Sequence, residues 1–164
     1  MHTVESNPRL ARFAQRIFVD VPLIQLVEMD SVAFLERLSA DPAVTSQTTL
    51  FYLDAHWERR LPLGDEIAIV TRNFPKAVMV VDDFQVPDDP DYTFDDFGPG
   101  RRLDIEYVRR TEVTGLEVFF PAMRGAEEDL PRRGCVVMTT NGSLATTLRG
   151  IELLRPFPFS TSIT

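Results

Sequence analysis

The sequence predicts an α/β fold with a Rossmann-like, mostly parallel sheet and one late antiparallel strand. Short apolar runs alternate along the chain with segments of helical periodicity, the pattern that produces parallel sheets. Two of these runs, residues 49–53 and 77–81, stop directly at carboxylates. Ligands of such sheets lie beyond the carboxyl ends of the strands, so these carboxylates are candidate ligand contacts. A length of 164 residues suits one domain, predicted to span residues 1–164.

The first elements are predicted from caps and spacing. Residues 3–5 form a short β-like start, and Asn7-Pro8 caps a helix with Pro in its first turn. Residues 23–29 predict a strand, after which Asp30 or Ser31 caps the next helix. Apolar positions recur at helical spacing in both helices: Leu10, Phe13, Ala14 and Ile17 in the first, and Val32, Leu35 and Leu38 in the second.

The later elements follow the same logic. Residues 49–53 and 77–81 predict buried strands, and a helix over residues 63–72 lies between them. Asp65 and Glu66 fall in the first turn of that helix, where its dipole favours them. The remaining predicted elements are an acidic, aromatic loop over 84–100, a helix over 103–110, and strands over 115–120 and 135–140 that are joined by a loop or short crossover.

Composition excludes some partners and favours a cytoplasmic protein. The net charge is 17 − 25 = −8, which argues against binding nucleic acid or anionic membranes through bulk electrostatics. The start of the sequence lacks the pattern of a signal peptide, and no apolar run approaches the ~20 residues of a membrane helix. Cys135 is the only cysteine and lies in an apolar run, so we interpret it as an inert core thiol.

Two segments could carry chemistry at the carboxyl ends of the strands. Asp54 could coordinate a hard cation, while Trp57 could stack on a planar ligand; alternatively, Asp54 caps a loop and Trp57 is core. Asp82 and Asp83 repel each other unless a cation or hydrogen-bond donors compensate. A Mg²⁺ ion shared with Asp54 would do so; the alternative is a loop cap beside a solvated acid.

Other features allow more than one interpretation. Glu5 ends a strand before a helix, where dinucleotide-binding folds hold a ribose hydroxyl, although an exposed Glu is the simpler interpretation. The acidic loop over residues 84–100 is either a substrate lid or a solvated loop. The Arg pairs at residues 101–102 and 132–133 are interpreted as surface charges.

Four segments, in this order, resemble class I S-adenosylmethionine-dependent methyltransferases, over roughly residues 1–140. They resemble the ends of that family's second to fifth strands: Val4-Glu5-Ser6-Asn7-Pro8, Glu28-Met29-Asp30-Ser31, Leu53-Asp54-Ala55-His56-Trp57 and Val80-Val81-Asp82-Asp83. The pattern is most similar to the metal-dependent O-methyltransferases, which include catechol O-methyltransferase and the macrolide-sugar enzymes. The resemblance implies a Mg²⁺ site at Asp54, Asp82 and Asp83. It also implies a cofactor site lined by Glu5, Asp30, Ser31, His56 and Trp57.

The sequence departs from that family in several places. Ala55 is inserted in the fourth-strand motif, Asp83 replaces an Asn, and Glu58 falls where the catechol enzyme has its catalytic Lys. His56 is therefore the candidate base. The family's first strand and Gly-rich turn should precede Glu5 by some twenty residues, so we expect an N-terminally truncated domain that lacks them. The glycines near residue 100 cannot replace that turn, because they follow no strand.

The family resemblance, together with the missing first strand and Gly-rich turn, leads us to expect one of two functions. The first is methyl transfer from S-adenosylmethionine to a small-molecule hydroxyl, such as a sugar or natural product, with a divalent cation assisting. The second is a non-catalytic, methyltransferase-like remnant that acts by binding or as a homo-oligomer, because strands without their central neighbour leave backbone groups unpaired. A third reading is a start codon upstream of Met1, which would restore the missing strand.

Overall fold

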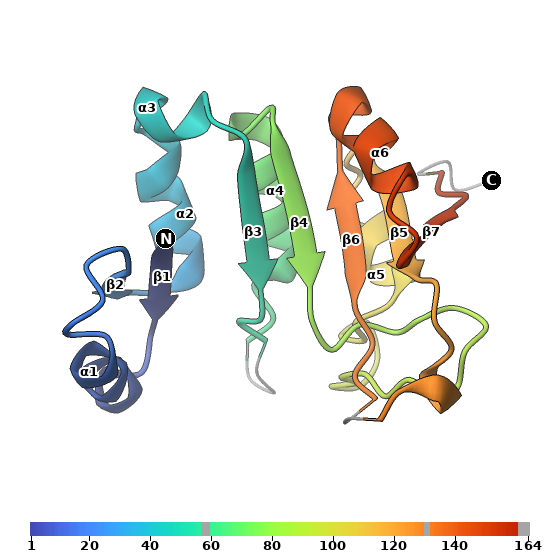
Figure 1. Ribbon diagram of the computed structural model, residues 1–164, viewed down its shortest axis with the longest axis horizontal. Coiled ribbons are helices and arrows are strands. Elements are labelled where there is room, and N and C mark those ends of the chain that lie inside the picture. The colour runs from blue at the N-terminus through green and yellow to red at the C-terminus, as the bar shows by residue number, and fades with distance from the viewer. Residues whose placement is uncertain (57–59, 130–131, 161–164) are drawn as a thin grey trace.

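The strands of this α/β protein lie in two sheets that share no strand pairing within the described residues. The computed structural model describes residues 1–56, 60–129 and 132–160. The smaller sheet contains β1 (His2–Glu5) and β2 (Gln25–Glu28), which run parallel. The larger sheet has the order β3-β4-β6-β5-β7. In Figure 1 the small sheet stands beside β3, the edge strand of the larger one.

The larger sheet is mixed, with antiparallel strands late in the chain. Its strands are β3 (Thr49–Leu53), β4 (Ala77–Val81), β5 (Glu117–Pro121), β6 (Val136–Thr139) and β7 (Leu154–Phe157). β3 and β4 pair in parallel, whereas β6 is antiparallel to both β4 and β5. β6 is therefore the late antiparallel strand that the sequence predicts. β7 is a second antiparallel strand, paired with β5, and lies outside that prediction.

The helices begin where side chains cap them. Asn7, Asp30, Asp104 and Asn141 each accept hydrogen bonds from backbone N–H groups of the helix that follows. The helices are α1 (Pro8–Ile17), α2 (Ser31–Ser39), α3 (Pro42–Thr45), α4 (Leu63–Asn73), α5 (Ile105–Arg109) and α6 (Gly142–Arg149), with a 3₁₀ turn η1 (Gly125–Glu127). α2 packs on α4 behind the sheet, and α6 lies in front of it (Figure 1).

The main core lies between the larger sheet and the helices behind it. Phe51 and Leu53 of β3 contribute to it, together with Leu63, Ile67 and Val70 of α4. A smaller cluster packs beneath α6. The prediction that β3 is a buried strand is wrong for one of its faces, where Leu50 and Tyr52 are 66% and 61% exposed. Their alternation with Phe51 and Leu53 is the pattern of a strand covered on one side only.

The described helices are short. Among residues 1–56, 60–129 and 132–160, no helix has the length and apolar character needed to cross a lipid bilayer.

Candidate functional site

The candidate site lies at the carboxyl ends of β3 and β4. These strands are parallel neighbours, and the Asp82 N–H donates to the Leu53 carbonyl oxygen at 3.2 Å. The residues that follow them, Asp54 on one side and Asp82 and Asp83 on the other, therefore emerge at the same edge of the sheet. Their charges affect one another, because both Asp82 and Asp83 act to raise the pKa of Asp54. The expected meeting of three carboxylates at one rim is found.

Asp82 has protein partners for its carboxylate. The Tyr52 hydroxyl donates to Oδ2 of Asp82, and the Asp83 N–H donates to Oδ1 at 2.9 Å. The hydrogen bond to Asp82 also raises the pKa of the Tyr52 phenol, so this hydroxyl keeps its proton. Sequence reasoning missed Tyr52. The strand register could have indicated it, because Tyr52 stands opposite Val80, two residues before Asp82 and on the same face.

Asp83 is held by Arg133, which lies in the segment before β6. Nε of Arg133 donates to Asp83, and its NH2 group donates to Asp95 at 2.7 Å. The bond with Asp83 raises the pKa of Arg133 above its already high ordinary value. The repulsion between Asp82 and Asp83 is thus relieved by protein groups, Tyr52 for one and Arg133 for the other. Arg133 was interpreted as a surface charge, but its ion pairs tie the acidic loop to the rim.

His56 presents a buried nitrogen that has no partner among the described residues. The side chain is only 7% exposed, and Nε2 lies 3.2 Å from the Asp82 carbonyl oxygen. A carbonyl oxygen only accepts hydrogen bonds, so Nε2 carries a proton, and in the neutral form of the ring Nδ1 is then an acceptor. No hydrogen-bond partner reaches Nδ1 within the described chain. A buried imidazole with one fixed nitrogen and one vacant nitrogen can accept a proton or bind a metal ion.

Asp54 is the rim carboxylate for which no hydrogen bond or ion pair is recorded in the described chain. Burial is the main cause that raises its pKa, and the neighbouring acids add to that effect while His56 opposes it. A cation would offset both burial and repulsion here. Within the described residues, however, no three His, Cys, Asp or Glu side chains are arranged as a ready-made metal site.

Of the residues expected on the cofactor side, Glu5, Asp30 and Ser31 lie at or just beyond the ends of the small sheet, whereas His56 follows β3 of the larger sheet. Glu5 ends β1, and its Oε1 accepts the Asn7 N–H at 2.7 Å. Asp30 follows β2, caps α2 through Val32 and Ala33, and pairs with Arg60. The structure therefore brings the expected residues together as two groups, one on each sheet. Trp57, the remaining expected cofactor contact, lies outside the described residues, as does Glu58.

Glu66, in the first turn of α4, is another buried polar group. Unlike His56, it was not predicted from the sequence as a site residue. The residue has no exposed area, and burial raises its pKa. The Ser31 hydroxyl beside it partly opposes this shift, but neither carboxyl oxygen reaches a well-formed hydrogen bond within the described chain. Glu66 thus lies where the beginning of α2, with Ser31 that was expected to face the cofactor, packs against α4.

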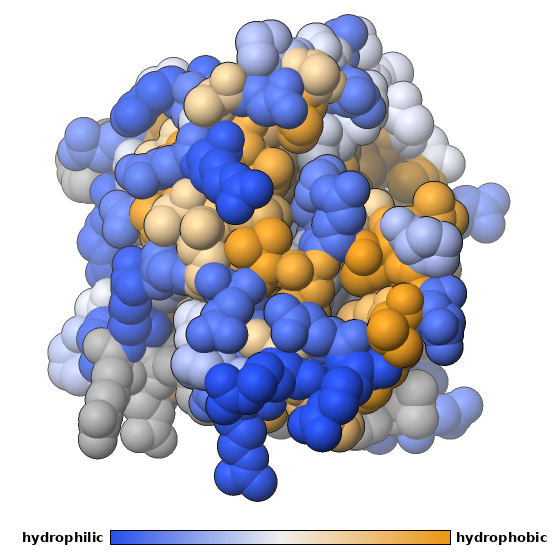
Figure 2. Space-filling view, turned by 90° about the vertical axis from the view of Figure 1, so that its left-hand side faces the viewer, coloured by the Kyte–Doolittle hydropathy of each residue, from blue (hydrophilic) through white to orange (hydrophobic). Residues whose placement is uncertain are grey.

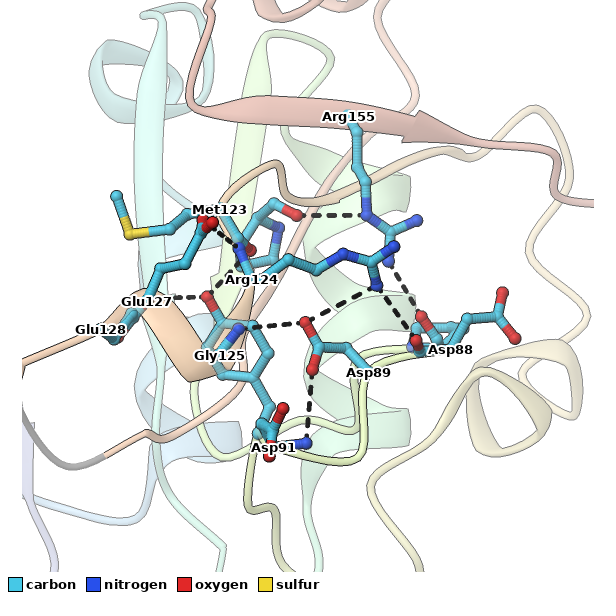
Figure 3. A network of polar contacts seen from close by, with 12 residues as sticks. Asp88, Asp89, Asp91, Met123, Arg124, Gly125, Glu127, Glu128 and Arg155 are labelled. Carbon is cyan, nitrogen blue, oxygen red and sulfur yellow. Dashed lines mark hydrogen bonds and ion pairs between the residues drawn. The ribbon is translucent and has the colours of Figure 1, made fainter.

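The first half of the acidic loop is fixed rather than loosely solvated. Asp89 is buried and accepts the Gly125 N–H at 3.0 Å and the Asp91 N–H at 3.3 Å. Figure 3 shows this carboxylate pointing at η1, with Arg124 reaching back to the Asp88 carbonyl oxygen. Arg155 of β7 adds a hydrogen bond to the Pro87 carbonyl oxygen at 2.9 Å. These contacts anchor the loop where it leaves the sheet.

Comparison with known proteins gives no family assignment. No protein-family model matches the chain, and no curated protein matches it.

Proposed function

We propose that this chain has the function of a methyltransferase, which moves the methyl group of S-adenosylmethionine to a small-molecule hydroxyl with help from a divalent cation. The observation that carries the proposal is the rim of β3 and β4, where Asp54, Asp82 and Asp83 emerge at one edge of the sheet and the buried His56 lies against the Asp82 backbone. Its support from sequence is the order of the four strand-end segments. The acceptor class follows from the same resemblance, with a sugar or natural product as candidates.

The described side chains suit distinct tasks in such a reaction. Asp54 and Nδ1 of His56 are the rim groups for which the described chain supplies no hydrogen-bond partner, which makes them the candidates to hold a cation or accept a proton. A bound cation would lower the pKa of the acceptor hydroxyl and orient its oxygen. Asp82 and Asp83 are already engaged by Tyr52 and Arg133, so their direct ligation would require those partners to move.

The residues expected to bind S-adenosylmethionine differ in how far other protein groups already occupy them. Glu5 presents a carboxylate at the end of β1, the position from which such folds bind ribose hydroxyls. Asp30 and Ser31 lie at the beginning of α2, and Asp30 is occupied by its cap and by Arg60. Glu5 is thus the residue here with the clearest capacity to bind a ligand hydroxyl.

Isothermal titration calorimetry tests the two halves of the proposal separately. S-adenosylmethionine should bind the wild-type chain saturably and bind the Glu5→Ala variant at least ~tenfold more weakly, because a charge-assisted hydrogen bond is lost. Mg²⁺ should bind the wild type and lose affinity in Asp54→Asn. Asp20→Asn, which removes an exposed charge elsewhere, is the matched control. Absence of cofactor binding at millimolar concentration would remove the enzyme proposal.

The separation of the strands into two sheets favours a second candidate function, a non-catalytic module that acts by binding or oligomerisation. Among the described residues, β1 and β3 each have one edge that pairs with no strand, and the surface around β1 is rich in exposed apolar side chains (Figure 2). A chain that forms stable complexes but binds no S-adenosylmethionine would support this function over the first.

A further inference from the structure

Arg133 joins the rim of β3 and β4 to the acidic loop through two carboxylates. Its Nε donates to Oδ1 of Asp83, and its NH2 group donates to Oδ1 of Asp95 at 2.7 Å. The side chains of Asp83 and Asp95 are 20% and 25% exposed, so water screens these contacts less than it screens a surface ion pair. Arg133 is therefore a fixed positive charge at the edge of the sheet where the candidate site lies.

The backbone near Arg133 brings these two carboxylates together. Thr93 donates its N–H to the Arg132 carbonyl oxygen at 2.7 Å, which ties the loop to the segment before β6. Asp95 donates its own N–H to the Asp83 carbonyl oxygen at 2.9 Å. The proximity of Asp83 and Asp95 thus has support from hydrogen bonds that do not involve the Arg133 side chain.

Asp83 adopts an uncommon backbone conformation at this edge. Its φ is 53°, in the left-handed region that few residues other than glycine adopt, although Asp tolerates it better than most. Backbone conformations of this kind cluster at functional sites. The turn is fixed on both sides, because the Asp83 N–H donates to Oδ1 of Asp82 and the Asp83 carbonyl oxygen accepts from Asp95. These hydrogen bonds hold the Asp83 carboxylate at the rim.

Acidic groups outnumber basic ones around this edge. Asp82, Asp83 and Asp95 all act to raise the pKa of Asp54, so the four carboxyl groups lie within electrostatic reach of one another. Within the part of the chain that the structure describes, Arg133 is the basic side chain that forms ion pairs with two of them. One guanidinium leaves most of the charge of four carboxylates uncompensated. The edge therefore retains the capacity to attract a further cation.

The buried ring of His56 is an independent sign that a ligand belongs at this edge. The residue is 7% exposed, and its Nδ1 has no hydrogen-bond partner among the described residues. Buried polar atoms in folded proteins almost always have a partner, so an unsatisfied one points to a bound ion, a water molecule or a catalytic role. His56 also acts on the pKa of Asp54, which places the ring within electrostatic reach of that carboxyl group.

We propose that Arg133 is an internal cation that regulates the metal site of this rim by competing with the divalent ion for Asp83. This inference rests on the proposed function. Arg133 acts in two ways of the same sign: it occupies an oxygen of Asp83, and its charge repels a divalent ion at the same edge. With Arg133 in place, Asp54 is the carboxylate left for the ion. Displacement of Arg133 adds Asp83, so the site fills only at a cation concentration high enough to displace the guanidinium.

Isothermal titration calorimetry with Mg²⁺ on the whole chain tests this competition. Arg133→Gln removes the positive charge and the donor to Asp83, and should bind Mg²⁺ at least about tenfold more tightly than the wild type. Arg133→Lys keeps the charge and should stay within about threefold of the wild type. The matched control is Arg132→Gln, at an exposed neighbour that donates to the Ala126 carbonyl oxygen, and it should also change the affinity by less than about threefold.

NMR of the wild-type chain supplies a test that needs no variant. The Arg133 Nε–H donates to Asp83, so its ¹H–¹⁵N resonance reports this hydrogen bond directly. Saturating Mg²⁺ should shift that resonance, with a midpoint equal to the Kd from calorimetry. The Nε–H of Arg155 on β7, which donates to the Pro121 carbonyl oxygen, should keep its position. If Arg133→Gln does not fold, this titration decides alone.

The outcomes separate this proposal from the proposed function. Equal Mg²⁺ affinity of wild type and Arg133→Gln would overturn the competition, and the metal site would stand if Asp54→Asn still loses the ion. An equal gain in Arg132→Gln would also overturn it, because net charge alone would explain the effect. An Arg133 Nε–H resonance that Mg²⁺ does not move would do the same.

Two further outcomes concern the proposed function as well. Absence of Mg²⁺ binding in both the wild type and Arg133→Gln would overturn the competition together with the metal site. Tighter Mg²⁺ binding in Arg133→Gln by a chain that binds no S-adenosylmethionine would support the competition and remove the methyl-transfer function.

Discussion

Glu66 is a carboxyl group with no exposed surface, and it makes the stability of the protein depend on pH. Burial raises its pKa in the folded state, while the unfolded chain has the ordinary value near 4.3. The folded protein therefore holds this proton more tightly. The contribution of this bound proton to the free energy of unfolding is fully present below the pKa of Glu66 in the unfolded chain. It is lost as the pH rises through the raised pKa of Glu66 in the folded protein.

The Glu66→Gln variant should consequently be more stable than the wild type at neutral pH. Gln keeps the shape of the side chain and never ionises, so the variant gains about 1 kcal/mol or more near pH 8. The gain shrinks toward pH 4, where wild-type Glu66 is protonated. Urea unfolding of both proteins across this range measures the difference. A gain that is constant with pH would show that ionisation of Glu66 is not its cause.

Asp89 anchors the acidic loop through two backbone N–H groups, one on Asp91 and one on Gly125. Asp89→Ala leaves these donors without their acceptor and should cost about 2 kcal/mol in urea unfolding. Limited proteolysis should also cut residues 84–100 faster. Asp88→Asn is the matched control, because Asp88 is exposed and Asn tolerates its positive φ of 62°. Equal losses in the two variants would contradict the anchoring role of Asp89.

At the scale of elements, Gly134 sets how closely the segment before β6 approaches the segment after β4. Phe84 donates its N–H to the Gly134 carbonyl oxygen, and a Cβ at residue 134 would lie 2.1 Å from the Phe84 carbonyl oxygen. Gly134→Ala should therefore cost about 3 kcal/mol or more. Gly142→Ala, in the first turn of α6 with open space around it, should be neutral or stabilising by about 0.5 kcal/mol. Thermal unfolding of the two variants compares them directly, and similar Tm values would refute the close approach.

The elements that the sequence predicts well are those whose signals are local. Asn7 and Asp30 cap helices in the structure, and both apolar runs that end at carboxylates are strands with the predicted bounds. β7 and α6 were not predicted. β7 contains a Pro and charged Arg155, and its place at the sheet edge depends on its distant partner β5 rather than on its own pattern.

At the scale of the molecule, the two sheets should differ in local stability. β1 and β2 form a two-stranded sheet, which is marginal alone, whereas β4 and β6 lie in the middle of five strands. We expect backbone amides of Thr3 and Val27, which bond across the small sheet, to exchange with solvent at least ~100-fold faster than those of Val80 and Val137. Native-state hydrogen exchange by NMR measures this. Equal protection would show that the two sheets unfold together.

The part of the candidate site that depends on strand order alone was predictable from the sequence. Asp54, Asp82 and Asp83 meet because parallel strands deliver their carboxyl ends to one edge. The partners of these acids were not predictable, because Tyr52 acts through strand register and Arg133 comes from a segment fifty residues further along the chain. The orphan nitrogen of His56 likewise depends on which carbonyl group the fold places next to its ring.

The divided sheet also has a mechanical consequence. Within the described chain, no strand pairing joins β1 to β3, so sliding or rotation of one sheet against the other breaks no ladder hydrogen bond. The two sheets are held together instead by the packing of α2 on α4 and β1 and by the ion pair between Asp30 and Arg60. Glu5 moves with β1, and Asp54 moves with β3. The distance between the two halves of the candidate site is therefore set by side-chain packing and not by a continuous strand ladder.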